Sequence, residues 1–170
     1  MKNLTFLVIY FFYFGCSENS LGPQEEQSQD VRKIYSTVIE ERFSASDLIL
    51  IVSDSTLRML MSRTAYQNLI GDLEGVTTEL LDTYNELNST RQHILSIPDI
   101  DYVFASDYDG SESGRVVLSL SRVAFNNERT VAIMVLGEYY APLVGCGIMF
   151  LLEKQDDIWV ITKSTLIWIS

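Results

Sequence analysis

The chain has 170 residues, and its 12 lysines and arginines face 23 aspartates and glutamates, which gives a net charge of −11. This excess of acid argues against nucleic acid as a partner, because binding to phosphates depends on clustered basic side chains. It also argues against a purely electrostatic attachment to anionic lipid.

The first fifteen residues have the pattern of an export signal. Lys2 supplies a positive charge, and residues 4–14 form an apolar run of eleven residues without a charged side chain. A helix that crosses a bilayer needs about 20 such residues, whereas the hydrophobic region of a signal peptide is shorter. Gly15 supplies the small residue expected before a cleavage site. We therefore predict a signal peptide over residues 1–15.

The sequence Tyr13-Phe14-Gly15-Cys16 resembles the lipobox of bacterial lipoproteins. The resemblance implies that Cys16 receives a diacylglycerol, becomes the first residue after cleavage, and anchors the protein in a membrane through acyl chains such as palmitate. The usual lipobox has an aliphatic and then a small residue where this chain has Tyr13 and Phe14. The alternatives are an ordinary secretory signal with an incidental cysteine and a buried amino-terminal strand, and the polar segment that follows argues against the strand. The expected location is the bacterial cell envelope, at the outer membrane.

Residues 16–29 are expected to form a tether. The stretch SENSLGPQEEQSQD, residues 17–30, contains Gly, Pro, Ser, Gln and Glu, with Leu21 as its only large apolar side chain. Such a composition buries too little surface to offset the entropy of ordering. Without residues 1–15 the chain keeps 11 basic and 23 acidic residues, a net charge of −12. Residues 30–170 then have the size of a single domain.

The domain is expected to begin with a helix and a strand. Apolar residues recur at helical spacing over residues 30–43, and Asp30 is a candidate N-cap. The segment DLILIVSDS, residues 47–55, contains five consecutive aliphatic residues, which predict a buried strand.

Two further helices are predicted after this strand. A short one is expected to begin at Asp54 or Ser55 and to end near residue 63. A longer one is expected over residues 65–88. Gly71 and Gly75 weaken it by about 1 kcal/mol each relative to alanine, so a break near them is expected.

The second half of the chain predicts strands. After a long connection over residues 89–114, apolar and polar residues alternate between polar turns. The strands are expected over residues 115–125, 130–140, 146–154 and 158–164, with 165–170 as an extension or a fifth strand. Short connections favour antiparallel neighbours. The predicted fold is α+β: amino-terminal helices packed on one face of a carboxy-terminal antiparallel meander sheet of about four to five strands.

Three carboxy-terminal segments resemble a group of uncharacterised bacterial envelope proteins. They are SRVAFN at residues 121–126, GCGIMFLLEK at residues 145–154, and the closing WIS. Paired cysteines often occur in that group near the middle of this region, where this chain has Ala141 and Val144. The resemblance implies the meander fold and no particular activity.

An acidic loop is the best candidate for cation chemistry. It contains Asp99, Asp101, Asp107, Asp109 and Glu112. The motif DYDGSE offers alternating carboxylates and a turn glycine, and Ca²⁺ binds six to eight oxygens from such loops. Asp107, Asp109 and Glu112 are therefore weak candidate Ca²⁺ ligands, although the spacing of an EF-hand is missing. The alternative is a solvated loop without a ligand.

Catalytic residues are not indicated by any motif. His93 is the only histidine, and Cys146 would be the only cysteine left after lipidation of Cys16. Such a pair cannot form a structural zinc site of the usual Cys/His type. We interpret Cys146 as a buried, inert thiol and His93 as an exposed turn residue.

Four aromatic residues stand in the predicted strands: Tyr139, Tyr140, Trp159 and Trp168. We interpret them as packing residues of the core. An exposed cluster would instead indicate a face that binds a ligand or a partner.

These observations predict a lipid-anchored envelope protein that acts as a binding or interaction module, with another envelope protein as a possible partner. The alternatives are an envelope hydrolase that uses carboxylates of the 99–112 loop, and a helper in the assembly of a neighbouring protein. No cofactor is expected apart from the weak possibility of Ca²⁺.

Overall fold

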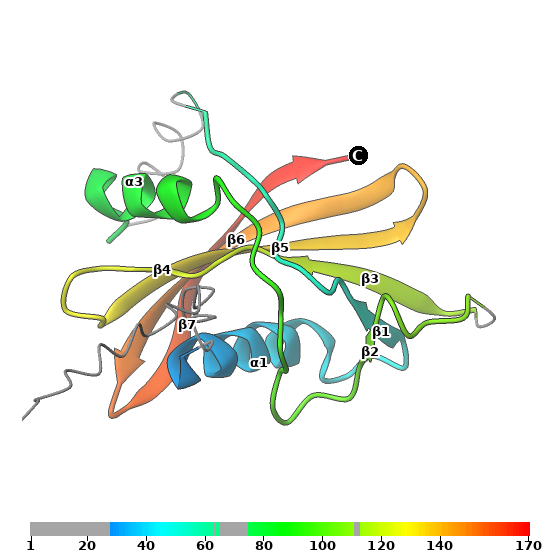
Figure 1. The fold of residues 1–170 in the computed structure, drawn as a ribbon. Coiled ribbons are helices and arrows are strands. Elements are labelled where there is room, and N and C mark those ends of the chain that lie inside the picture. The colour runs from blue at the N-terminus through cyan, green and yellow to red at the C-terminus, as the bar shows by residue number, and fades with distance from the viewer. Residues whose placement is uncertain (1–27, 63, 65–74, 111–112) are drawn as a thin grey trace, which may run out of the picture.

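The computed structural model describes residues 28–62, 64, 75–110 and 113–170. Seven strands form one mixed sheet in the order β2-β1-β3-β5-β6-β7, with β4 paired to β5 beside this path. Within these described residues, two helices lie against the sheet (Figure 1). The elements are α1 (Gln29–Phe43), β1 (Ile49–Val52), α3 (Thr78–Leu87), β2 (Val103–Phe104), β3 (Arg115–Leu120), β4 (Ala124–Phe125), β5 (Val131–Ala141), β6 (Val144–Gln155) and β7 (Ile158–Ile169).

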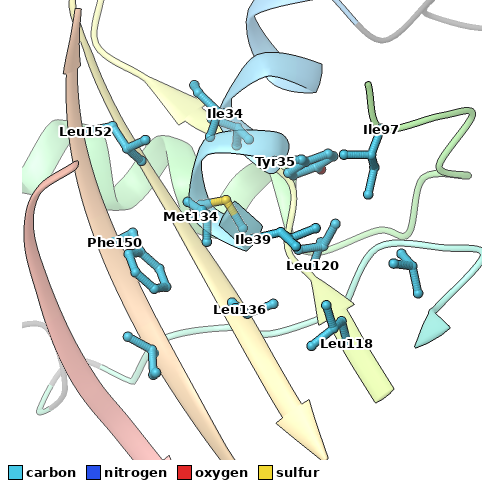
Figure 2. Close-up of a cluster of buried hydrophobic side chains, with 14 of the residues drawn as sticks. Ile34, Tyr35, Ile39, Ile97, Leu118, Leu120, Met134, Leu136, Phe150 and Leu152 are labelled. Atoms are coloured by element: carbon cyan, nitrogen blue, oxygen red, sulfur yellow. The ribbon is translucent and has the colours of Figure 1, made fainter. Parts of the chain in front are cut away.

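Helix α1 packs its apolar stripe on one face of the sheet. Its N-cap is Ser28, whose side chain accepts a hydrogen bond from the Val31 N–H, so Asp30 belongs to the first turn and is not the cap. The buried Tyr35 hydroxyl donates to the carbonyl oxygen of Ser121 at 2.9 Å. Figure 2 shows the core between helix and sheet, and its labelled side chains are Ile34, Tyr35, Ile39, Ile97, Leu118, Leu120, Met134, Leu136, Phe150 and Leu152.

Helix α3 packs on the opposite face (Figure 1). Alternation along β5 explains this, because Met134 and Leu136 lie in the α1 core while Ile133 and Val135 lie in a second core beneath α3. A strand directs successive side chains to opposite faces, and both faces of β5 are apolar. The prediction that helices cover only one face is therefore wrong.

The sheet is also larger than predicted and is mixed, so the expected antiparallel meander of four to five strands describes only part of it. β5, β6 and β7 form the meander, and β3 pairs antiparallel with β5. β1 joins the same sheet by parallel pairing with β3, where Ile51 lies opposite Val117, and with β2, where Ile51 lies opposite Val103.

Several predicted boundaries differ from the structure. No helix occurs over residues 53–62, where β-bridges pair Ser55 with His93 and Leu57 with Ser121. The strand predicted over 115–125 is divided into β3 and β4. β7 runs to Ile169, so residues 165–169 form the predicted extension and not a fifth strand.

The sequence predicts a helix over residues 65–88. Residues 75–88 of this range are described, and α3 is the helical part of them. A left-handed backbone at Gly75, with φ of +94°, precedes it, in agreement with the predicted break. Residues 65–74 lie outside the described part of the chain. None of the described helices is long and apolar enough to cross a membrane.

The two hairpin turns of the meander use different residues. The register places Pro142 and Leu143 between β5 and β6, and Asp156 and Asp157 between β6 and β7. Leu143 has φ of +62°, and both aspartates have positive φ. Aspartate tolerates this conformation, whereas a bulky side chain rarely adopts it.

Candidate functional site

A pocket of about 870 Å³ lies beside the carboxy-terminal half of α1. Its walls are α1, the connection from α1 to β1, β1 itself and the segment 99–103. Ligand pockets commonly have volumes of about 300–1,000 Å³, so this cavity can accommodate a small molecule or a side chain of a partner. It is therefore the candidate site.

The segment that closes the pocket is held against α1 by hydrogen bonds. The Ser36 hydroxyl donates to the carbonyl oxygen of Pro98 at 2.6 Å. The Tyr102 hydroxyl accepts from the Ile97 N–H at 3.1 Å. Parallel pairing of β2 with β1 then fixes the end of the segment. The Ser36 contact joins residues that are 62 positions apart in the chain, whereas the Tyr102 contact is internal to the segment.

The pocket combines apolar and acidic walls. Its apolar lining includes half-buried side chains that also pack against the α1 core, namely Leu48, Leu50, Ile100 and Tyr102. Five exposed carboxylates line it as well: Glu40, Glu41, Asp47, Asp99 and Asp101. No lysine or arginine is found among the described residues of the lining. This chemistry suits a ligand that carries a positive charge on an apolar body.

The structure separates the carboxylates of the predicted acidic loop. Asp99 and Asp101 line the pocket, whereas Asp107 and Asp109 do not. Asp107 is exposed, and its N–H donates to the carbonyl oxygen of Phe104 in a turn. Glu112 lies outside the described residues. Within the described part of the chain, no group of three or more His, Cys, Asp or Glu side chains is placed to hold a metal ion.

His93 and Cys146 belong to different parts of the fold. His93 is exposed, and its backbone forms a bridge with Ser55. Cys146 is half-buried on β6, opposite Glu138 of β5. The Cys146 thiol points to a carboxylate and not only to apolar neighbours, with Sγ at 3.8 Å from Glu138 Oε2.

Glu138 is the centre of a cluster that sequence reasoning missed. Its side chain is fully buried and pairs with Arg42 of α1 through two hydrogen bonds, from Nε at 2.8 Å and from Nη2 at 3.2 Å. The Tyr140 hydroxyl donates to the same carboxylate at 2.8 Å. A charged residue inside the apolar strand TVAIMVLGEYY was the available signal, since a buried charge requires a partner.

The cluster fixes the end of α1 rather than activating a nucleophile. Burial, with the Glu138 carboxylate as a second cause, raises the pKa of Cys146 above its ordinary value, so the thiolate is disfavoured. Burial and the hydrogen bond to Glu138 raise the pKa of Tyr140 to about 12. The hydrogen bond to Glu138 raises the pKa of Arg42. Arg42 does not line the pocket, but its neighbours Glu41 and Phe43 do, so the ion pair holds one wall of the site.

The four aromatic residues are divided between core and surface. Trp159 is buried, and its Nε1 donates to Asp30 at 3.2 Å. Tyr139 and Trp168 are half-buried and contact each other, with ring centroids 5.5 Å apart. Tyr140 is exposed, so the interpretation of all four as core residues is wrong for this one.

Comparison with known proteins gives no relative: no family model, no curated protein and no solved structure matches this chain.

Proposed function

We propose that this chain is a lipid-anchored protein of the bacterial envelope that acts as a binding module, with the acidic pocket as its ligand site and Cys16 as its anchor. The observation that carries the proposal is the pocket itself, in which apolar walls and five carboxylates occur together. The lipobox-like segment supports the location.

The charge distribution defines the ligand class. A carboxylate attracts a cation weakly in water and more strongly where water is displaced. Leu48, Leu50 and Ile100 provide the surface from which an apolar group displaces water. A primary amine or guanidinium on a short apolar body satisfies both walls, whether it is a free amine or a basic side chain of another envelope protein.

The binding test uses two probes that differ in charge. 2-Phenylethylamine and 3-phenylpropanoate have similar size and apolar area but opposite charge, and both are titrated calorimetrically into the lipidated chain. The amine is expected to bind and the acid is not. Replacing Asp99 and Asp101 together by asparagine is expected to weaken amine binding about tenfold, the equivalent of 1.4 kcal/mol.

Asp107→Asn is the matched control, because it removes a carboxylate from the same loop outside the pocket. Equal binding of amine and acid, or equal weakening by the control, would contradict the proposal.

The anchor is tested separately. Cys16→Ser removes the thiol that would be acylated. Labelled palmitate should therefore be incorporated into the chain without substitutions and not into the Cys16→Ser variant. Cys146→Ser is the control, since its thiol lies within the folded domain and should leave incorporation unchanged. Incorporation that survives Cys16→Ser would contradict the lipoprotein assignment.

A further inference from the structure

The β5–β6 turn and the end of β7 form an exposed apolar surface, which we call the apolar tip. It consists of Tyr140, Leu143, Val144, Leu166 and Ile169. The sheet register brings them together, because Ile169 lies opposite Cys146 and Leu166 opposite Ile148. Leu143 is 89% exposed and Ile169 is 74% exposed. This surface is at the opposite end of β6 from the β6–β7 turn (Figure 1).

The tip is formed by two segments without charged side chains. Residues 139–152 and 164–170 contain no Asp, Glu, Lys or Arg, although the whole chain has 23 acidic and 12 basic residues. Most of this acidic protein is repelled from an anionic surface. Glu138, the charged residue directly before the first of these segments, is paired with Arg42, so the apex can approach lipid without the cost of removing an unpaired charge from water.

The turn places an aliphatic side chain where folding alone would favour another residue. Leu143 has a left-handed backbone with φ of +62°. This conformation costs about 1–2 kcal/mol for residues other than glycine, and glycine or asparagine is the usual choice. Leu143 contributes little to the core at this exposure. We therefore expect its side chain to contact something outside the folded domain.

Aromatic rings lie behind the aliphatic apex. Tyr140 is exposed on one face of the sheet, and the half-buried pair of Tyr139 and Trp168 lies on the other. Tyrosine and tryptophan are enriched at the level of lipid headgroups, and here they offer apolar ring surface to that level, because the Tyr140 hydroxyl already donates to Glu138. An aliphatic apex followed by such rings fits a membrane interface better than it fits a flat protein surface.

We propose that the apolar tip inserts into the surface of a lipid bilayer, with Leu143 and Val144 among the acyl chains and the aromatic rings at headgroup level. This proposal goes beyond ligand binding and uses a different part of the molecule.

The proposed anchor can reach the same bilayer as the tip. The Ser28 hydroxyl is 3.5 Å from Arg129 Nη2, close to the start of α1 at the β6–β7 end. The twelve residues of β6 span about 40 Å at the usual rise of a strand. The twelve peptide links from Cys16 to Ser28 reach about the same distance when extended. The tip can therefore insert while Cys16 is anchored, with the strands inclined to the membrane.

The two tryptophans allow a direct test. Trp168 lies at the tip, and Trp159 is buried at the other end of β7. The lipidated chain is reconstituted in phosphatidylcholine vesicles whose acyl chains are brominated close to the headgroup. Trp168 emission, measured in Trp159→Phe, should be quenched several-fold more than Trp159 emission, measured in Trp168→Phe. The emission of Trp168 is also obtained by subtracting the emission of Trp168→Phe from that of the lipidated chain without substitutions. This subtraction leaves Trp159, and therefore the core, unchanged.

Leu143→Asp should remove the additional quenching of Trp168 and leave the circular dichroism spectrum unchanged. Ile158→Asp is the matched control, because Ile158 is exposed on β7, the strand that carries Trp168, but at the other end of that strand. Equal quenching of both tryptophans, or quenching that Leu143→Asp leaves intact, would overturn the proposal. Self-association is tested without lipid, by quenching Trp168 with aqueous acrylamide. If Trp168 becomes better protected from acrylamide as the protein concentration rises, the proposal is overturned in favour of self-association.

Discussion

Strand β6 ends in a two-residue turn on each side, and the two turns use opposite chemistry. Asp156 and Asp157 both have positive φ, in a turn whose twist suits a hairpin. At the other end a proline precedes Leu143, and only Leu143 has positive φ. The first turn is made from residues that favour its conformation, whereas the second retains a leucine that does not.

The two ends of α1 differ in the opposite sense. At its start, Asp30 receives a hydrogen bond from Trp159 and lies 3.5 Å from Lys154 Nζ, in a partly exposed cluster. At its end, Arg42 pairs with the fully buried Glu138. The comparison teaches that the β6–β7 turn uses residues that suit its backbone, while the tip end combines a strong internal attachment with an unfavourable exposed surface.

The largest effect is expected from Arg42→Met, which leaves the carboxylate of Glu138 buried without its cation. Removing one partner of a buried ion pair costs about 3–5 kcal/mol, and the partial exposure of Arg42 places the expected loss near 3 kcal/mol. The free energy of unfolding in urea measures it. Lys33→Met, on the exposed side of the same helix, should change it by less than about 0.5 kcal/mol. Similar values for both variants would contradict the assigned role of the pair.

Gly147→Ala should have the second largest effect. A methyl group there would overlap the indole of Trp168, including Nε1. Overpacking of this kind costs about 1–3 kcal/mol, and Trp168 emission should shift because the ring must move. At Gly137 the added carbon would meet Tyr139 Cε2 at 3.2 Å, so Gly137→Ala should be milder. A larger loss of stability for Gly137→Ala than for Gly147→Ala would show that Trp168 does not lie over Gly147.

Leu143→Gly should stabilise the fold. It removes a left-handed cost of about 1–2 kcal/mol, and part of this gain is lost to the greater freedom of glycine in the unfolded chain. A net gain of about 0.5–1 kcal/mol is expected in the same urea titration. Asp157→Gly, in the other turn, should give a smaller gain in the free energy of unfolding, because aspartate already tolerates positive φ. A loss of stability would mean that Leu143 contributes to the fold after all.

The smallest effect concerns the other end of α1 and depends on pH. Burial acts to raise the pKa of Asp30, but the hydrogen bond from Trp159 and the charges of Lys154 and Arg129 outweigh it, so the pKa lies below the ordinary 3.8. Its contribution is therefore present above about pH 4 and is lost as pH falls through the value in the folded protein.

Partly exposed pairs contribute about 0.5 kcal/mol. The difference in stability between the unmodified chain and Asp30→Asn should accordingly shrink as the pH falls from 6 to 2. A difference that does not depend on pH would show that the ion pairs of Asp30 contribute nothing.

Local sequence patterns predicted those elements whose signal lies within the element itself or in its adjacent turns. Helical spacing indicated α1, and alternation between short turns indicated β5, β6 and β7. The pairing of β1 with β3 was not predicted, because Ile51 and Val117 are far apart in the sequence and no local pattern links them. The same limit applies to the site, since Asp99 and Asp101 were noted as acidic residues whereas their position beside α1 depends on the Ser36 contact.

The position of α1 has a consequence for the order in which the protein folds. Its apolar stripe, with Ile34 and Ile39, is covered by side chains such as Leu136 and Phe150, which are made about a hundred residues later. Synthesis proceeds from the amino terminus, so the helix is complete long before its covering exists. The nascent domain must therefore carry an uncovered hydrophobic surface until its last third emerges, and this interval is when it most needs the protection of a chaperone.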